Sequence, residues 1–404
     1  MEDGTDARAF LAKAAATFAV LSLLPVALSG SAPSHASAAL RTISSSDFGA
    51  VPIGDVPWST SLFASFTYEH GVAFGTYAQF GYNATTGTVR SLIGLEGRAP
   101  VLFLESIDIE GFPPARSAAA RGPIFEAAGY LVTITAHDDP TALLEIRSDM
   151  PRLVTVELPA WSTNISLVSV PGSWRASSVS FVVQGEEARL FLGAGWFNVT
   201  GTTVFAHLAS PDLLVFKSVP AGSTNKAEWR AVLDAISAGH VVSELDLVAI
   251  ADGGWMQNPG RYRIDVATWP LAVRAGQASV QVDTLRPGGA VVLLAFDSNT
   301  MPAADPTRLI VRANGNPVNR SNDTLTLFYA PDSLTRDASY SLLPLRGTVI
   351  ALYLPSLAAV SVEVVSVPPP APNPAFDRGS EAAVVAALAI VSVAAARMLR
   401  RREE

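Results

Sequence analysis

The strongest constraint on the fold is an alternation of apolar and polar residues that runs from Ser44 to Val367. It is clearest in residues 153–158, 165–170, 262–266, 279–283 and 361–364. Successive side chains of a strand point to opposite faces of a sheet, so a period of two indicates strands with one buried face. Short Gly, Pro, Asn and Asp segments separate the strands, as in β-sandwiches. We therefore predict an all-β protein made of tandem, immunoglobulin-like β-sandwich units.

Three strand-like segments that end in proline divide this region at comparable intervals, at Pro159, Pro270 and Pro368. We predict three sandwich units, over residues 44–160, 161–270 and 271–367. Residues 81–89 and 196–204 echo each other, because each has an aromatic residue before an N-x-[ST] sequence in a hairpin-like segment. Chance similarity between threonine-rich hairpins is the alternative. Asn314-Gly315 predicts a hairpin with a type I′ turn.

One segment interrupts the strands with helical spacing of apolar residues, near 225–238. Capping residues precede it at 223–225, and Gly239 provides a stop. We predict a helical insert in the second unit that packs against one end of the sandwich, with partner binding as the alternative.

The N-terminal residues 1–38 are typical of a secretory signal peptide. Arg8 and Lys13 precede an apolar run at residues 14–28, and Ala36-Ser37-Ala38 fits a cleavage site. An uncleaved N-terminal anchor is the alternative. We predict export.

The C-terminal end combines a proline-rich spacer at 368–380, an apolar stretch at 381–399 and a charged tail at 400–404. We predict a single transmembrane helix, because the apolar stretch is long enough to cross a bilayer. The arginines at its end place the C-terminus in the cytoplasm and the rest outside the cell. A short core helix is the alternative, although it does not explain this order of segments.

This tail resembles the C-terminal sorting signals of archaeal cell-surface glycoproteins, which combine a short motif, a hydrophobic helix and a basic end. Pro374-Ala375-Phe376 stands where that family has Pro-Gly-Phe. The resemblance implies that the chain is held at the cell surface.

Potential N-glycosylation sites agree with export. Five asparagines fit N-x-[ST] without proline in the middle: Asn83, Asn164, Asn198, Asn319 and Asn322. If they are used, they lie in solvent-facing segments. The chain has no cysteine, so its stability depends on the size of its core and not on disulfides.

The composition excludes several classes of function. Only 16% of residues are charged, and no basic stripe interleaves with aromatic residues, so we expect no nucleic-acid partner. The absence of cysteine excludes thiol catalysis, Cys-ligated zinc and iron–sulfur clusters. We find no H-E-x-x-H, G-x-S-x-G or phosphate-binding motif. We predict that the protein is not an enzyme and needs no cofactor.

Acidic residues form weak candidate sites. Asp108 and Glu110 share one face of an expected strand, where a carboxylate pair could serve glycoside hydrolysis. His137-Asp138-Asp139 and Asp297-Ser298-Asn299 could bind a structural calcium through oxygen ligands. In each case a solvated strand end or a turn is the preferred interpretation.

A stripe of aromatic residues occupies even positions along two expected strands: Phe66, Tyr68, Phe74, Phe80 and Tyr82. Such a face could stack on sugar rings. It could equally be the core of the sandwich, which is the interpretation that we favour.

From the sequence we predict a membrane-anchored, N-glycosylated surface protein with a structural or adhesive role, whose partners are envelope proteins or glycans. The alternative is an extracellular carbohydrate-binding or carbohydrate-processing module. A ligand-binding part of a transport system is a third reading, supported only by the predicted location.

Overall fold

The computed structural model describes residues 62–97, 99–112, 115–169, 176–250, 254–284, 289–301, 308–329, 337–355 and 359–367. The predicted signal peptide, spacer, transmembrane helix and tail all lie outside these residues. Within the described ranges, no helix is long and apolar enough to cross a membrane.

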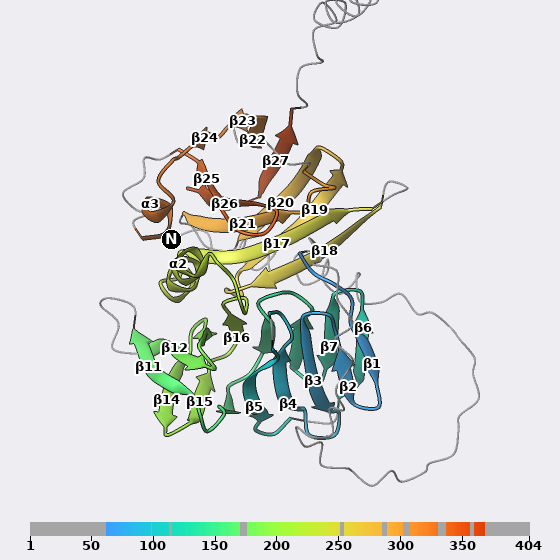
Figure 1. The fold of residues 1–404 in the computed structure, drawn as a ribbon, viewed down its shortest axis with the longest axis vertical. Helices are drawn as coiled ribbons and strands as arrows, with labels where there is room; N and C mark the ends of the chain where they lie inside the picture. Colours follow the sequence, from blue (N-terminus) through green and yellow to red (C-terminus); the bar gives the residue numbers. More distant parts are fainter. Residues whose placement is uncertain are drawn as a thin grey trace, which may run out of the picture. The chain divides into compact units, whose positions relative to one another are not determined.

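Two eight-stranded sheets form the first part of the described chain (Figure 1). Sheet A has the order β1 (Thr67–Glu69), β2 (Val72–Phe74), β3 (Ala78–Asn83), β4 (Thr88–Gly94), β5 (Val101–Ile109), β10 (Arg152–Glu157), β15 (Thr203–Leu208) and β14 (Trp196–Thr200). Sheet B has the order β11 (Thr163–Ser169), β12 (Ala176–Val183), β13 (Glu186–Leu192), β16 (Asp212–Ser218), β9 (Leu144–Ser148), β8 (Val132–His137), β7 (Ile124–Ala128) and β6 (Ser117–Arg121). We call sheets A and B together sandwich 1.

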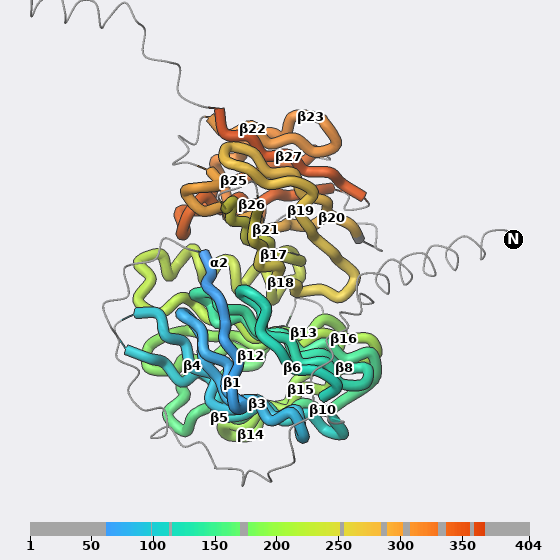
Figure 2. Tube along the Cα trace, turned by 90° about the vertical axis from the view of Figure 1, so that its right-hand side faces the viewer, coloured from blue at the N-terminus to red at the C-terminus, as the bar shows by residue number. Residues whose placement is uncertain are grey.

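Two smaller sheets form sandwich 2. Sheet C has the order β18 (Trp255–Arg261), β17 (Val241–Ala249), β21 (Ala290–Phe296), β26 (Thr348–Leu354), β25 (Ser339–Leu343) and β24 (Asn319–Arg320). Sheet D has the order β19 (Val266–Arg274), β20 (Gln277–Thr284), β27 (Val360–Ser366), β22 (Leu309–Ala313) and β23 (Asn316–Pro317). Figure 2 shows the last strand, β27, between β20 and β22. Two helices, α2 (Lys226–Ser237) and α3 (Thr324–Tyr329), accompany the sheets. The predicted all-β fold class is confirmed.

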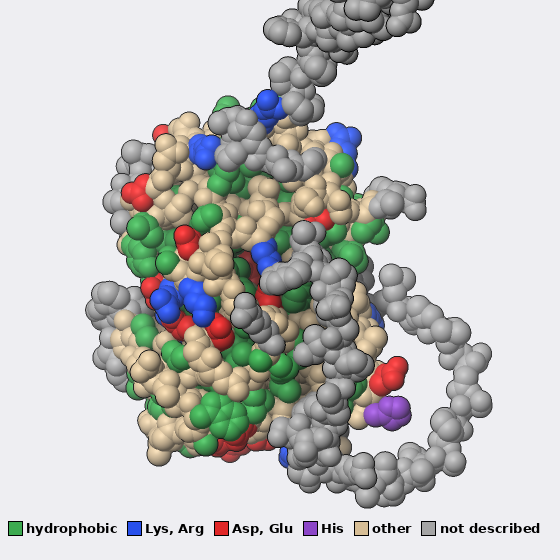
Figure 3. Space-filling model, in the orientation of Figure 1, with side chains coloured by type: hydrophobic (Ala, Val, Ile, Leu, Met, Phe, Trp, Pro, Cys, Tyr) green, Lys and Arg blue, Asp and Glu red, His purple; other side chains and the backbone are tan. Residues whose placement is uncertain are grey.

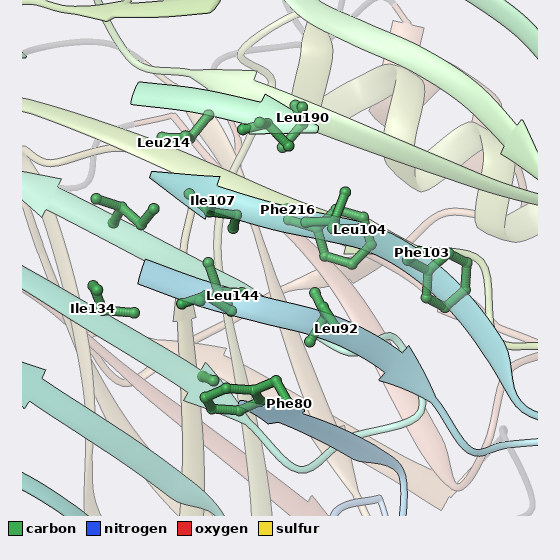
Figure 4. Packing of buried hydrophobic residues seen from close by; sticks show 14 of the residues in the cluster. Phe80, Leu92, Phe103, Leu104, Ile107, Ile134, Leu144, Leu190, Leu214 and Phe216 are labelled. Atoms are coloured by element: carbon green, nitrogen blue, oxygen red, sulfur yellow. The ribbon is translucent and has the colours of Figure 1, made fainter. Parts of the chain in front are cut away.

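Aromatic and aliphatic side chains from both sheets fill sandwich 1. Phe125 of β7 is fully buried and meets Tyr68, Phe80 and Tyr82 edge-on, with ring centroids 4.9–5.3 Å apart. Figure 4 shows residues of sheet A, such as Leu92, packed against residues of sheet B, such as Leu144. Edge-to-face ring pairs add to the free energy of burying the rings. This packing joins the two sheets into one core.

The predicted boundary between the first and second units is wrong. In sheet A, β10 lies between β5 and β15, and in sheet B, β9 pairs with both β8 and β16. Residues 44–160 and 161–270 therefore supply strands to the same two sheets. The sandwich is also larger than the 7–9 strands of an immunoglobulin domain. Alternation along a strand shows which face is buried but not which strand lies beside it.

The predicted boundary between the second and third units also falls inside a strand. Residues 270 and 271 belong to β19, and β17 and β18 from the predicted second unit complete sheet C. Pro270 does not end β19, because β19 is an edge strand whose pairing is irregular between Pro270 and Ala272. Proline is tolerated at sheet edges and bulges, where its missing N–H breaks no needed hydrogen bond.

Two local predictions are confirmed. Helix α2 begins after Asn225, and Gly239 follows its end with a φ of 75° that suits glycine. Asn314 and Gly315 connect β22 to β23 with φ values of 50° and 80°, as a type I′ turn requires.

The outer face of sheet B is covered at β16, and that of sheet C at β21, in addition to their inner faces. Every residue of β16 and of β21 is buried. A third apolar cluster contains Val215 of sheet B, Leu293 of sheet C and Leu233 of α2. Helix α2 packs against β17 and β13, and Figure 1 shows it beside β17. Sheets B and C thus share an apolar layer that α2 closes on one side.

Candidate functional site

A cavity of about 770 Å³ lies where α2 meets both sandwiches. Its wall includes Glu96 and Glu186 from sandwich 1, Asn225 and Trp229 at the start of α2, and Arg346 from the β25–β26 connection. The volume lies in the range of small-ligand sites. An indole, carboxylates, an amide and a guanidinium together can make both stacking and hydrogen-bonding contacts.

The start of α2 is held in place by contacts with both sandwiches. The Asn225 side-chain amide donates to the Pro344 carbonyl, and Lys226 Nζ lies 2.7 Å from a Glu186 carboxylate oxygen. Figure 3 shows basic and acidic side chains gathered side by side in this region. These contacts position Trp229 one turn into the helix, at the cavity wall.

Glu96 presents a buried carboxylate oxygen to this region. Its Oε1 pairs with Arg346, while Oε2 is buried and has no hydrogen-bond partner among the described residues. Burial raises the pKa of Glu96 to about 7, although the Arg346 guanidinium acts to lower it. The group can therefore change charge near neutral pH and can accept or donate a hydrogen bond to a ligand.

A buried ionic cluster lies behind Trp229. Lys217 Nζ lies 2.7 and 2.9 Å from the two carboxylate oxygens of Glu244 and 3.1 Å from Thr141 Oγ1. The ammonium also lies 5.8 Å from the ring centroids of Trp229 and Tyr262, within cation–π range. Burial acts to lower the pKa of Lys217, but the Glu244 and Asp139 carboxylates raise it above its ordinary value. Lys217 therefore stays charged.

Asn258 of β18 bridges the acids of this cluster. Its Nδ2 donates to Asp139 at 3.3 Å and to Asp246 at 3.2 Å, and its Oδ1 lies 2.6 Å from His137 Nδ1. Burial and the neighbouring Glu244 charge raise the pKa of Asp246 well above its ordinary value. The amide thus joins the end of β8 in sandwich 1 to β17 and β18 in sandwich 2.

His137 and Glu145 continue this junction. His137 Nε2 lies 3.5 Å from Glu145 Oε1, which also accepts the backbone N–H of Arg261 at 2.8 Å. Burial acts to lower the pKa of His137, but Glu145, Asp139 and Asn258 together raise it, so the net shift is upward.

The two aspartates after His137 bind their own chain. The Asp138 carboxylate accepts backbone N–H groups of residues 76–78 at 2.7–3.1 Å, and Asp139 accepts the Thr141 amide and hydroxyl. Burial raises the pKa of Asp138 to about 6, although the three N–H donors act to lower it. These carboxylates stabilise turns and the junction between the sandwiches.

Asp297 begins the second candidate calcium site, and its carboxylate also binds its own chain. Its Oδ1 accepts the Thr300 amide at 2.8 Å and the Thr300 hydroxyl at 2.6 Å. Among the described residues, no three His, Asp or Glu side chains are grouped so that they could hold a metal ion.

The aromatic stripe lies mostly in the core of sandwich 1, as the favoured interpretation had it. Phe66, Phe80 and Tyr82 are buried, and Tyr68 packs against the same cluster. Phe74 alone is exposed, with 39% of its surface accessible. These five rings therefore form no flat face on which a sugar could stack.

Asp108 is exposed on β5, whereas Glu110 is exposed in the turn that follows this strand, so the two do not share one strand face as expected. Asp108 accepts hydrogen bonds from Thr88 at 2.7 Å and from Ser106 at 3.3 Å. Arg152 donates to the backbone carbonyl of Glu110 and not to its carboxylate. Neither carboxylate is buried.

All five sequon asparagines lie at the surface. Asn164, Asn198, Asn319 and Asn322 are exposed, and Asn83 is partly exposed.

Neither the cavity nor the ionic cluster was predicted from the sequence, although the sequence holds a signal for the cluster. Lys217 stands inside the apolar segment 212–218, and Glu244 and Asp246 stand inside the apolar segment 241–249. Charged residues within such runs must be paired if the strand is covered on both faces. The cavity itself joins segments that are far apart in the chain, and no local pattern encodes it.

Comparison with known proteins adds little to this picture. No protein-family model matches the chain, and no curated protein matches it. Among solved structures, a glycoside hydrolase family 81 protein from Clostridium thermocellum, solved as a mutant, is similar over 75% of this chain, with 13% identity and a TM-score of 0.33. This chain spans 38% of that protein's length. A similarity this distant carries no argument about function.

Replacing Lys217 tests whether the ionic cluster stabilises the junction. Lys217→Met leaves the Glu244 carboxylate buried and unpaired, which should lower the free energy of unfolding by about 3–5 kcal/mol. Lys226→Met is the matched control, because its ion pair has the same 2.7 Å length but its side chain is 36% exposed. The control should lose less than about 1 kcal/mol. Urea unfolding measures both, and equal losses would contradict the assigned role.

The raised pKa values predict that stability falls as pH rises. Folding raises the pKa of Glu96 from 4.5 to about 7, so the folded state holds a proton that the unfolded state has lost. This contribution is complete below pH 4.5 and is lost as pH rises through about 7. Between these two pKa values, the free energy of unfolding falls by about 1.4 kcal/mol for each pH unit. The total contribution of Glu96 is therefore roughly 3 kcal/mol. Urea unfolding from pH 5 to 8 should show a decline that Glu96→Gln makes shallower, and an unchanged slope in that variant would contradict the prediction.

Proposed function

We propose that this chain is an exported, glycosylated β-sandwich protein, held at the cell surface by its C-terminal segment, with a structural or adhesive role. The observation that carries the proposal is the placement of the sequons. All five asparagines reach solvent, and three of them, Asn164, Asn198 and Asn319, lie on the edge strands β11, β14 and β24.

The fold is suited to this role. Four sheets give a large core without disulfides, which a chain free of cysteine needs outside the cell. The cluster around Lys217 links the two sandwiches and lines only a small cavity of about 50 Å³ among apolar side chains. We propose no catalytic step for it. Contacts with envelope proteins or glycans would use the exposed surfaces of the sheets.

Peptide mapping of the chain from its native envelope fraction tests the proposal. We expect the N-terminal segment 1–38 to be absent, the C-terminal segment to be retained or replaced by lipid, and glycans on the exposed asparagines. An intact N-terminus together with five unmodified asparagines would overturn it.

The cavity at α2 favours a second candidate function, the binding of a saccharide. Trp229 offers an aromatic surface, and Glu96, Asn225 and Arg346 offer hydrogen-bonding groups around it. Aromatic rings combined with a few well-placed polar groups are the common composition of ligand sites. This candidate would give the surface protein a recognition role.

Binding to an immobilised panel of neutral and N-acetylated oligosaccharides tests the second candidate. If the cavity binds a member of the panel, Trp229→Ala should weaken that binding at least tenfold, or by about 1.4 kcal/mol. Trp269→Ala is the control, because Trp269 is 40% exposed on β19 and lies outside the cavity. No binding, or an equal loss in both variants, would reject the cavity as a saccharide site.

A further inference from the structure

The hairpin of β14 and β15 carries an unusual arrangement on its outer face. Trp196, Asn198 and Thr200 alternate along β14 and are all exposed, whereas Phe197 between them is buried in the core. The asparagine and the threonine of one sequon therefore share a solvent-facing row with an indole ring. β14 is the last strand of sheet A, so the row runs along a free edge.

Trp196 is held in a fixed orientation by its neighbour across the hairpin. The register places Trp196 opposite His207, and the two rings stack with centroids 3.8 Å apart and planes at 8°. The indole still exposes 39% of its surface. Since His207 covers the face turned toward β15, the opposite face of the indole is turned toward the free edge.

A sugar on Asn198 would lie within reach of that ring. Residues two apart on one face of a strand are separated by about 6–7 Å. The first sugar of an N-linked glycan, attached at Nδ2, has a ring of C–H groups that can pack against an aromatic face. No other sequon has this feature, because the residues two positions before the other asparagines are Gly81, Ser162, Pro317 and Arg320.

A glycan on Asn198 would lie beside exposed edge strands of sandwich 1. β11, the edge strand of sheet B, contacts β14, so the edges of both sheets lie together at this end of sandwich 1. Trp161 and Leu167 expose 51% and 48% of their surfaces beside Asn164. Figure 3 shows hydrophobic side chains exposed in this region, at the lower left of the view. Unpaired edge strands with apolar side chains are sites of aggregation unless something covers them.

We infer that Asn198 carries an N-linked glycan whose first sugar packs on Trp196, and that this glycan covers the free edge of sandwich 1. The inference rests on the proposed export of the chain. It adds that Asn198 is the sequon at which the glycan stabilises the fold, with Trp196 as the residue that positions the sugar.

A double-mutant cycle on the full chain, secreted from a host that N-glycosylates exported proteins, tests this inference. Peptide mass spectrometry first measures the occupancy of all five sequons. Thermal unfolding then compares the parent chain with Asn198→Gln, Trp196→Ala and the double variant. We expect Asn198→Gln to lower Tm by about 2–4 °C when Trp196 is present and by less than about 1 °C when it is absent. Trp196→Phe keeps an aromatic ring and should preserve most of the effect.

Asn319→Gln is the matched control, because Asn319 is also exposed on an edge strand but has Pro317 in place of the indole. It should change Tm by less than about 1 °C, whether or not Trp196 is present. An unmodified Asn198 beside glycosylated sequons, or an Asn198→Gln effect that Trp196→Ala does not change, would overturn the inference and leave the proposed function standing. Five unmodified asparagines would overturn both.

Discussion

The apolar layer between sheets B and C is the constraint on which the rest of the described structure depends. An ordinary sandwich buries one face of each sheet and leaves the other to solvent, but β16 and β21 are buried along their whole length. Strands of this kind cannot stand alone in water, because both of their faces are apolar. Each sandwich therefore completes the other, and α2 closes the layer with Val232, Leu233 and Ile236.

This dependence explains why charged groups lie at the junction. Apolar contact alone does not fix how one sheet is placed over another, because it has no direction. The Lys217–Glu244 pair and the Asn258 bridge do have direction, and leaving either charge unpaired would be strongly unfavourable. The observed placement brings Glu244 of β17 to Lys217 of β16, and Asn258 of β18 to Asp139, and so satisfies these groups. The cavity beside Trp229 is a result of that placement.

Local features of the chain could be predicted because nearest neighbours along the sequence decide them. Alternation identified the strands, Asn314-Gly315 the turn, and apolar spacing the helix that ends before Gly239. The pairing of β10 with β15 and of β9 with β16 could not be predicted, because these partners lie far apart and Val156 or Ile146 would be equally buried in another sheet. The cavity could not be predicted for the same reason, since Glu96, Trp229 and Arg346 come from three distant segments. Residue type alone could not assign a role to the aromatic stripe, because aromatic rings that can pack on a sugar can also pack in a core.

The interleaving of strands in sandwich 1 has a consequence for the order in which the molecule can form. β10 cannot pair on both sides until β15 has been synthesised. In the same way, β9 pairs with β8 early but must wait for its second partner, β16. Because synthesis begins at the N-terminus, sheets A and B therefore stay incomplete until residue 218 has been made. Such long-range pairing makes folding slow. Under the export that we propose, slow closure is an advantage, because a polypeptide that stays unfolded until it has crossed a membrane can pass through a narrow channel.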